Sequence, residues 1–168
     1  TGAVSAPRTV ALLRAAVGLS SYDYYLLGLT TSGSLDTAFG SGTSGVRQVT
    51  FSGLGSLRSN VAMTVDDLGR IVVLLTRLED GTTSDLDTMA LRYTANGAID
   101  ASFGEQGLMT IEDSGVDVPT DTFAGDLLML PDGSAAASVA RGSDWLLVRF
   151  DDDGVFSSGA STPETVGQ

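Results

Sequence analysis

The sequence predicts an all-β fold built from β-propeller-like blades, and two observations lead to this prediction. First, residues 85–107 (D-L-D-T-M-A-L-R-Y-T-A-N-G-A-I-D-A-S-F-G-E-Q-G) repeat the pattern of residues 22–42, so that Gly33 aligns with Gly97 and Phe39 with Phe103. Second, short apolar runs alternate with turn residues throughout the chain. Repeated units of roughly 40–60 residues with about four strands each are typical of propeller blades. We therefore expect about three four-stranded antiparallel blades, which form part of a propeller or are completed by other chains.

The first unit, residues 9–59, is expected to contain three strands. Residues 10–17 are the first strand; their good helix formers make a helix an alternative, but alignment with residues 69–78 and 133–141 favours a strand. Residues 24–29 are the second strand and end at a two-residue turn, Ser32-Gly33. Residues 46–51 alternate apolar and polar side chains and are the third strand. Residues 1–8 are expected to be a tail or a weak edge strand, and residues 52–60 a loop.

The second unit, residues 60–122, repeats this order with four expected strands, at residues 61–65, 71–75, 89–93 and 108–111. The run I-V-V-L-L at residues 71–75 does not alternate, which indicates a strand that is buried on both faces. Asn96-Gly97 is a strong type I′ turn pattern after the third of these strands.

The third unit, residues 123–155, is expected to form strands at residues 123–130, 135–140 and 145–150. Turns are expected at Pro131-Asp132-Gly133 and at Gly142-Ser143. After Gly154 the repeat pattern ends, because V-F-S-S-G-A-S replaces L-D-x-x-F-G. Residues 156–168 are expected to be a C-terminal tail, and residues 162–168 within it are predicted to be disordered.

Composition excludes several classes of chemistry. The 168 residues carry a net charge of −12 and include no Cys, His or Lys. Imidazole and thiolate groups are therefore absent as bases, nucleophiles or metal ligands. The negative charge disfavours nucleic acid and anionic membrane surfaces as partners, and no apolar run is long enough to span a bilayer. The chain begins with Thr1 rather than Met, and we expect a processed N-terminus.

The repeat resembles a named family, the delta-60 repeat of bacterial secreted and surface proteins. The matching pattern is a G-R-I-V-V strand followed by M-A-L-R-Y, N-G, I-D, F-G and G, at residues 69–73, 89–93, 96–97, 99–100, 103–104 and 107. The first unit matches through S-G-S-L-D and F-G at residues 32–36 and 39–40, and the third through P-D-G and L-V-R-F at residues 131–133 and 147–150. The resemblance covers roughly residues 9–155. It implies a propeller-like fold in a secreted or cell-surface bacterial protein, and it carries no catalytic residue.

The residues of the repeated motif are expected to have structural roles. Gly33 and Gly97 supply positive φ angles in the turns. Phe39 and Phe103 are expected to anchor the long turn by burying a ring against the neighbouring blade. Asp36 and Asp100 are expected to accept backbone N–H bonds within that turn. A ligand-binding role for these residues is the less favoured alternative.

Arginine and aspartate also recur at strand ends. Arg14, Arg77 and Arg141 close one strand of each unit, and Asp23, Asp87 and Asp144 open the next. We expect cross-strand ion pairs, with Asp144 opposite Arg141 across a two-residue hairpin. A ring of ligand-binding arginines is the alternative.

Two further patterns suggest ligands. Residues 40–45 match the dinucleotide fingerprint G-x-G-x-x-G, but a strand follows where that motif requires a helix, so nucleotide binding is not expected. Asp151, Asp152 and Asp153 could hold Ca²⁺ through carboxylate oxygens. They align with ordinary hairpin turns, so an acidic turn is the favoured alternative. Asp113, Asp117 and Asp121, four residues apart in one loop, are a similar candidate.

Four aromatic residues, Tyr22, Tyr24, Tyr25 and Trp145, fall near equivalent hairpins of the first and third units. Such rings can stack on sugars, although packing in the core is their commoner use. The sequence thus favours a non-enzymatic structural or interaction module that associates with itself or with another protein. A carbohydrate-binding propeller lectin is the alternative, and a glycosidase that uses two carboxylates is a third. No cofactor is expected apart from Ca²⁺ at the acidic turn.

Overall fold

The chain folds as an all-β protein with three antiparallel sheets. A computed structural model describes residues 9–40, 44–51, 54–78, 86–111 and 121–155, which form ten strands and no helix. This part of the chain accordingly contains no helix that could cross a membrane. The two expected tails, residues 1–8 and 156–168, lie outside the described residues, as do Asp113, Asp117 and Gly42.

The first sheet has the order β1-β2-β3, with β1 at Thr9–Ala16, β2 at Tyr22–Leu29 and β3 at Val46–Gln48. The strand predicted near residues 10–17 is confirmed, and the helix alternative is excluded. β3 ends at Gln48 and is shorter than the 46–51 predicted, although the N–H of Val49 still donates to the carbonyl oxygen of Tyr24 in β2 at 2.8 Å.

The second sheet has the order β4-β5-β6-β7. Its strands are β4 at Ser56–Val65, β5 at Ile71–Leu78, β6 at Leu86–Tyr93 and β7 at Leu108–Ile111. Residues 71–76 are all buried, which confirms that this central strand is covered on both faces. The loop predicted at residues 52–60 is wrong at its C-terminal end, because β4 already begins at Ser56. The pairing of β4 with β5 shifts between Leu57 and Val61, and this irregularity breaks the alternation on which the sequence prediction depended.

The third sheet has the order β10-β9-β8, with β8 at Thr122–Met129, β9 at Ala135–Arg141 and β10 at Asp144–Phe150. It ends at the turn of residues 151–154, after which the described residues end at Val155.

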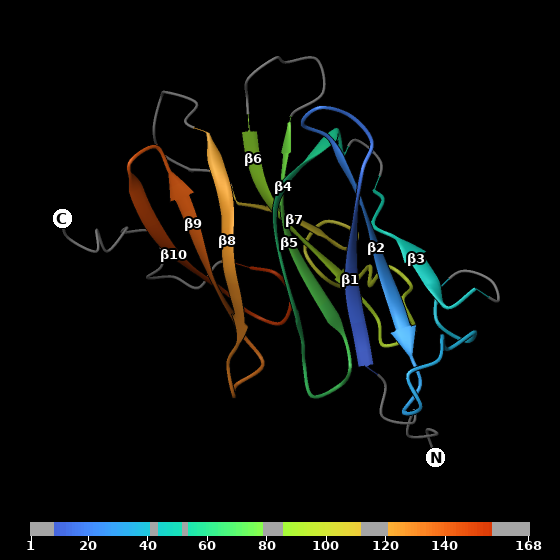
Figure 1. The fold of residues 1–168 in the computed structure, drawn as a ribbon. Coiled ribbons are helices and arrows are strands. Elements are labelled where there is room, and N and C mark those ends of the chain that lie inside the picture. Colours follow the sequence, from blue (N-terminus) through green and yellow to red (C-terminus); the bar gives the residue numbers. More distant parts are fainter. Residues whose placement is uncertain (1–8, 41–43, 52–53, 79–85, 112–120, 156–168) are drawn as a thin grey trace.

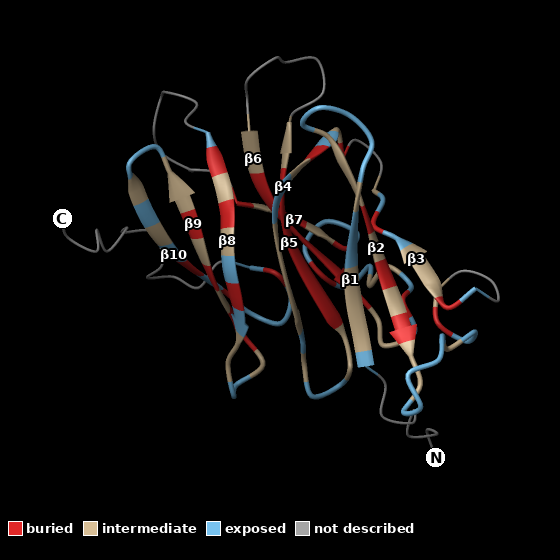
Figure 2. Ribbon diagram, in the orientation of Figure 1, coloured by how far each residue is buried: buried red, intermediate tan, exposed pale blue. Residues whose placement is uncertain are grey.

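The three sheets stack in chain order, with the four-stranded sheet in the middle (Figure 1). Two apolar cores separate them. One joins Tyr24, Leu26 and Phe39 of the first unit to residues of β5 and β6, and the other joins Phe103 and β7 to β8, β9 and β10. Figure 2 shows buried residues in the middle sheet and, alternating with less buried ones, along β2 and β8 of the neighbouring sheets. The sheets do not close into a ring, so the structure supports stacked antiparallel sheets without establishing a complete propeller.

The aligned turn glycines, Gly33, Gly97 and Gly154, make Leu26, Ala90 and Leu147 equivalent positions of the three units. The strand register then adds their partners on the neighbouring strands, which are Leu12, Leu74 and Ser138. By this equivalence, the described residues of the first sheet lack a strand corresponding to β4, and those of the third lack one corresponding to β7. Only the middle sheet therefore has the four strands expected of a complete blade.

Each sheet has two faces. We call the face that is directed toward the next sheet along the chain the forward face, and the opposite face the rear face. The forward face of a sheet carries Tyr24 and Leu26 in the first unit, and their equivalents Thr88 and Ala90 in the second and Trp145 and Leu147 in the third. The rear face carries the alternate residues, Tyr25 and Leu27, Met89 and Leu91, and Leu146 and Val148. Inside the chain, forward faces pack on the rear face of the next sheet.

Candidate functional site

We call the packing interface between two successive sheets a joint. In the joint between the first and second sheets, a phenylalanine of one sheet packs against a turn glycine of the next. Phe39 is fully buried, and a Cβ atom added to Gly97 would stand 2.9 Å from its ring. The N–H of Gly40 donates a 2.8 Å hydrogen bond to the carbonyl oxygen of Asn96. Gly97 has a φ of 82°, which suits glycine, and any side chain there would also meet the Phe39 ring. The Phe-Gly turn of one sheet is thus fitted to the hairpin turn of the next.

The joint between the second and third sheets has the same construction. Phe103 is 1% exposed and lies against Gly154, where an added Cβ would come within 2.9 Å of the ring. The N–H of Gly104 donates a 2.7 Å bond to the carbonyl oxygen of Asp153. Phe103 also meets the Phe150 ring edge-on, with centroids 5.9 Å apart. Two successive joints therefore use equivalent residues for the same contacts.

Asp36 and Asp100 hold the turns that carry these phenylalanines. Asp36 Oδ1 accepts the N–H of Ala38 at 3.0 Å, and Asp100 Oδ1 accepts the N–H of Ser102 at 3.2 Å. These are the backbone bonds that the sequence analysis expected. Burial acts to raise the pKa of the Asp100 carboxyl, but bonds from Ser102 and the Arg92 guanidinium outweigh it and hold the pKa below its ordinary value.

A buried arginine, Arg92, clamps the second joint. Its side chain is 3% exposed, and its guanidinium lies 4.8 Å over the Phe103 ring. Arg92 Nε donates to Asp100 Oδ2 at 2.8 Å, and Nη1 contacts the backbone carbonyl and a carboxylate oxygen of Asp152 in the third unit. Sequence reasoning missed this role, although a charged residue inside the apolar run M-A-L-R-Y signals a buried and paired arginine.

Asp152 also forms an ion pair with a second arginine of the middle unit. Arg70, in the turn between β4 and β5, contacts both carboxylate oxygens of Asp152 and donates from Nε to Asp66 Oδ2 at 2.6 Å. The Arg70 bond, together with the charge of Arg92, holds the pKa of Asp152 below its ordinary value despite partial burial. The carboxylate therefore fastens the third sheet to the second.

The acidic turn does not gather its carboxylates for Ca²⁺. Asp151 Oδ1 accepts the N–H groups of Asp153 and Val155, at 3.0 and 2.9 Å, and Asp152 is engaged by arginines. No group of three acidic side chains that could hold a metal ion occurs among the described residues. Asp121 accepts the N–H of Leu86 at 3.1 Å. The geometry of these residues is that of turn and strand-end hydrogen bonding.

The four aromatic candidates are not brought together. Tyr24 is fully buried and its hydroxyl donates to the Arg58 carbonyl at 2.6 Å, while Tyr22 is covered by Arg14, 4.7 Å above its ring. Tyr25 is half-buried on the rear face of the first sheet, and Trp145 is 54% exposed on the forward face of the third. Figure 1 shows β2 and β10 on opposite sides of the middle sheet, so no single sugar could contact these rings together.

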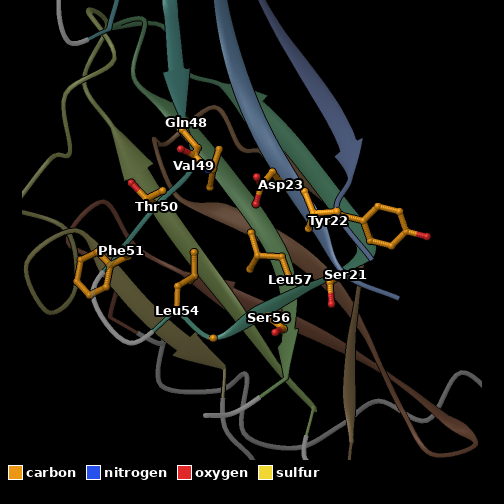
Figure 3. Close-up of a pocket in the computed structure, with 12 residues that line it drawn as sticks. Ser21, Tyr22, Asp23, Gln48, Val49, Thr50, Phe51, Leu54, Ser56 and Leu57 are labelled. Atoms are coloured by element: carbon orange, nitrogen blue, oxygen red, sulfur yellow. The ribbon is translucent and has the colours of Figure 1, made fainter. Parts of the chain in front are cut away.

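A groove of about 480 Å³ lies beside the first joint, between the start of β2 and residues 48–57 (Figure 3). The Asp23 carboxylate points into it, whereas the Tyr22 ring points away. Asp23 is the one carboxylate among the described lining residues. The pair of carboxylates that glycoside hydrolysis requires is therefore not present in this groove.

The recurring arginines differ between units. Arg77 Nη2 lies 3.1 Å from Asp87 Oδ2, and Asp144 pairs in register with Arg141, as predicted. The prediction for Arg14 is wrong, because Arg14 pairs in register with Tyr24, and Asp23 pairs with Ala15. The strand is offset by one residue from the sequence alignment, which places Arg14 over Tyr22 instead.

Each of the two outermost faces of the stack carries exposed apolar side chains. On the forward face of the third sheet, Trp145, Leu147 and Leu128 are 54%, 61% and 62% exposed. On the rear face of the first sheet, Leu13 is 55% exposed beside Tyr25 and Leu27. Neighbouring exposed apolar side chains are a common feature of protein-interaction surfaces.

The glycine turn of the first sheet is also open. Gly33 has a φ of 82°, equal to that of Gly97, yet nothing lies within 4 Å of a Cβ added there. The equivalent glycines of the second and third units each receive a phenylalanine ring from the preceding unit. The rear side of the first unit therefore has the shape of a joint whose other half is not supplied by the described residues.

No protein-family model, curated protein or solved structure that we compared with the chain matches it. The candidate site is accordingly defined by the internal repeat, which shows twice how one sheet of this type binds the next.

Proposed function

We propose that this chain is a non-enzymatic interaction module of delta-60-like repeats, from a secreted or cell-surface bacterial protein, which assembles by stacking its end sheets on other β-sheets. The repeated joint carries the proposal. Two internal copies have the same phenylalanine, turn glycine and backbone hydrogen bond. Of the two end faces, that of the first unit keeps the open turn glycine, Gly33, and that of the third keeps exposed apolar residues, Trp145 and Leu147, at positions that the internal joints cover. Burial of exposed apolar side chains at those faces supplies the driving force.

We favour a protein partner over a glycan. Among the aromatic residues that could stack on sugars, Tyr24 is buried and Tyr22 is covered by Arg14. Trp145 lies on the same sheet face as Leu147, and apolar residues along a sheet face suit another sheet better than a sugar ring. A glycan array probed with the purified chain should stay silent, and strong, selective glycan binding that Trp145→Ala abolishes would favour the lectin instead.

The molar mass in solution tests the proposal. Light scattering behind a sizing column should give a mass above the 17.2 kDa of one chain, and the mass should rise with protein concentration. Calcium is expected to leave the molar mass unchanged, since the described residues contain no group of three acidic side chains that could hold the ion. A mass of one chain at every concentration and salt level would contradict self-assembly.

A further inference from the structure

We propose that copies of this chain dock head to tail, the forward face of the third sheet of one copy packing on the rear face of the first sheet of the next. This inference rests on the proposed function, that the open end faces bind β-sheets, and it names the partner and the geometry. The two faces differ from each other, and each corresponds to one side of a joint that is already filled inside the chain.

The forward face of the third sheet carries apolar residues at the positions that the next sheet covers in the internal joints. Trp145 and Leu147 are equivalent to Tyr24 and Leu26, which are fully buried against the second sheet. They are also equivalent to Thr88 and Ala90, which are fully buried against the third. In both internal joints these positions are covered by the next sheet, whereas Trp145 and Leu147 are more than half exposed.

The rear face of the first sheet carries residues at the positions on which a preceding sheet packs in the other two units. Tyr25 and Leu27 are equivalent to Met89 and Leu91, which lie in the core between the first and second sheets. In the third unit the equivalent residues, Leu146 and Val148, face the middle sheet. No described residue packs on this face of the first sheet as the preceding sheet does in the other two units.

The open turn at Gly33 lies on this same rear side of the first unit. Gly97 and Gly154 are each filled by the phenylalanine of the preceding unit, and the space at Gly33 is free among the described residues. In the third unit the sequence has Ala160 at the position of Phe39 and Phe103. Docking between copies thus uses the sheet faces without the phenylalanine, and we expect it to be weaker than the internal joints.

A contact between two different faces is heterologous, so it propagates from copy to copy and yields either a ring or an open chain of copies. Each copy carries a net charge of −12, which opposes the approach of a second copy. We therefore expect association to strengthen as salt is added, because screening weakens this repulsion while the apolar contact remains.

A complementation experiment tests the direction of docking. Leu147→Glu places a charge on the forward face of the third sheet, and Leu13→Glu places one on the rear face of the first; both side chains are more than half exposed, so the fold should tolerate them. Each variant alone should lose association by about tenfold or more, because docking would bury a carboxylate in place of an apolar side chain. An equimolar mixture should form a 1:1 dimer through the one intact pair of faces, and grow no further. Leu128→Glu is a second forward-face variant, and Leu68→Glu, 71% exposed in the β4–β5 turn, is the control that should assemble like the unmodified chain.

The outcomes separate the two proposals, with circular dichroism and melting temperature checking that each variant is folded. Recovery of a dimer only in the mixture supports head-to-tail docking. Association of the unmodified chain that persists in both variants, or that the mixture does not restore, overturns head-to-tail docking and leaves the interaction module standing. An unmodified chain that stays monomeric at all salt concentrations overturns both self-assembly and this inference.

Discussion

Phe39 and Phe103 are the residues through which one sheet of this molecule recognises the next. Each ring is buried between its own sheet and a glycine of the following unit, and an added Cβ on Gly28 or Gly97 would clash with Phe39. A close fit of this kind leaves little room for relaxation when the ring is removed, so the contact is specific as well as stabilising.

Replacing either ring should be costly. We expect Phe39→Ala and Phe103→Ala each to lower the free energy of unfolding by about 3–5 kcal/mol, the usual result of emptying a packed aromatic site. Leu35→Ala, in the same connection as Phe39 but 45% exposed, is the control and should cost less than about 1 kcal/mol. Urea unfolding monitored by circular dichroism provides the values. Equal costs for Phe39→Ala and Leu35→Ala would contradict the packing role.

Asp152 should make stability depend on pH in the acid range. Its pKa is lowered in the folded state by Arg70 and Arg92, so its contribution is complete above the ordinary Asp pKa of about 4 and is lost as the pH falls through the lower, folded value. We expect Asp152→Asn to destabilise the protein at pH 6 and to differ less from the unmodified protein at pH 3. Urea unfolding at the two pH values measures this. Asp67→Asn, an exposed change in the β4–β5 turn, is the matched control, and a difference for Asp152→Asn that grows in acid would be inconsistent with these ion pairs.

At this scale the sequence predicted the local bonds better than the long-range ones. The turn bonds of Asp36 and Asp100 follow from an aspartate two residues before the N–H it accepts, and this pattern is visible in the chain. The contact of Arg92 with Asp152 joins residues 60 positions apart, so it depends on how two sheets stack. Nothing in the sequence of one unit specifies it.

The hairpin turns are the elements that distinguish a filled joint from an open one. Gly33, Gly97 and Gly133 have φ angles of 82°, 82° and 85°, so their backbones are nearly the same. Gly33 and Gly97 are equivalent turn glycines, whereas Gly133, in the β8–β9 turn, takes no part in a joint. Among these three, Gly97 has the Phe39 ring of the preceding unit against it, and the other two have open space.

Asparagine substitution separates these surroundings, since asparagine tolerates positive φ better than other side chains. We expect Gly97→Asn to cost about 1–3 kcal/mol, because its Cβ would meet the Phe39 ring and the Gly40 backbone nitrogen at about 3 Å. Gly33→Asn and Gly133→Asn, with open space around them, should each cost less than about 1 kcal/mol. Thermal or urea unfolding at low protein concentration measures all three. Similar losses at the three positions would show that backbone strain, and not the joint, sets the cost.

Most strands could be predicted from apolar runs and turn residues, and the errors have a common physical cause. β4 begins five residues before the predicted Val61, because its register shift hides the alternation of side chains. Arg14 lies one position away from the place that alignment gave it, and a shift of one residue moves a side chain to the opposite face. Faces are set by pairing between strands, and that pairing is only partly encoded in the local pattern.

The molecule as a whole is a stack with two unlike ends. Its middle sheet is complete and covered on both sides, whereas the end sheets have three described strands each and an apolar outer face. The exposed apolar residues at the two ends are equivalent to residues that the internal repeat covers, and this equivalence is the basis of the proposed head-to-tail docking.

The absence of cysteine in the sequence allows a direct measurement of which faces meet. We would prepare Leu13→Cys and Leu147→Cys and treat each variant, and their mixture, with a short bifunctional maleimide at low and high salt. Head-to-tail docking predicts that the mixture gives cross-linked dimers containing one chain of each variant, with few dimers from either variant alone and more product at high salt. Dimers formed mainly between like chains, or no cross-linking at concentrations where the chain associates, would contradict the claim that the two end faces are halves of one joint.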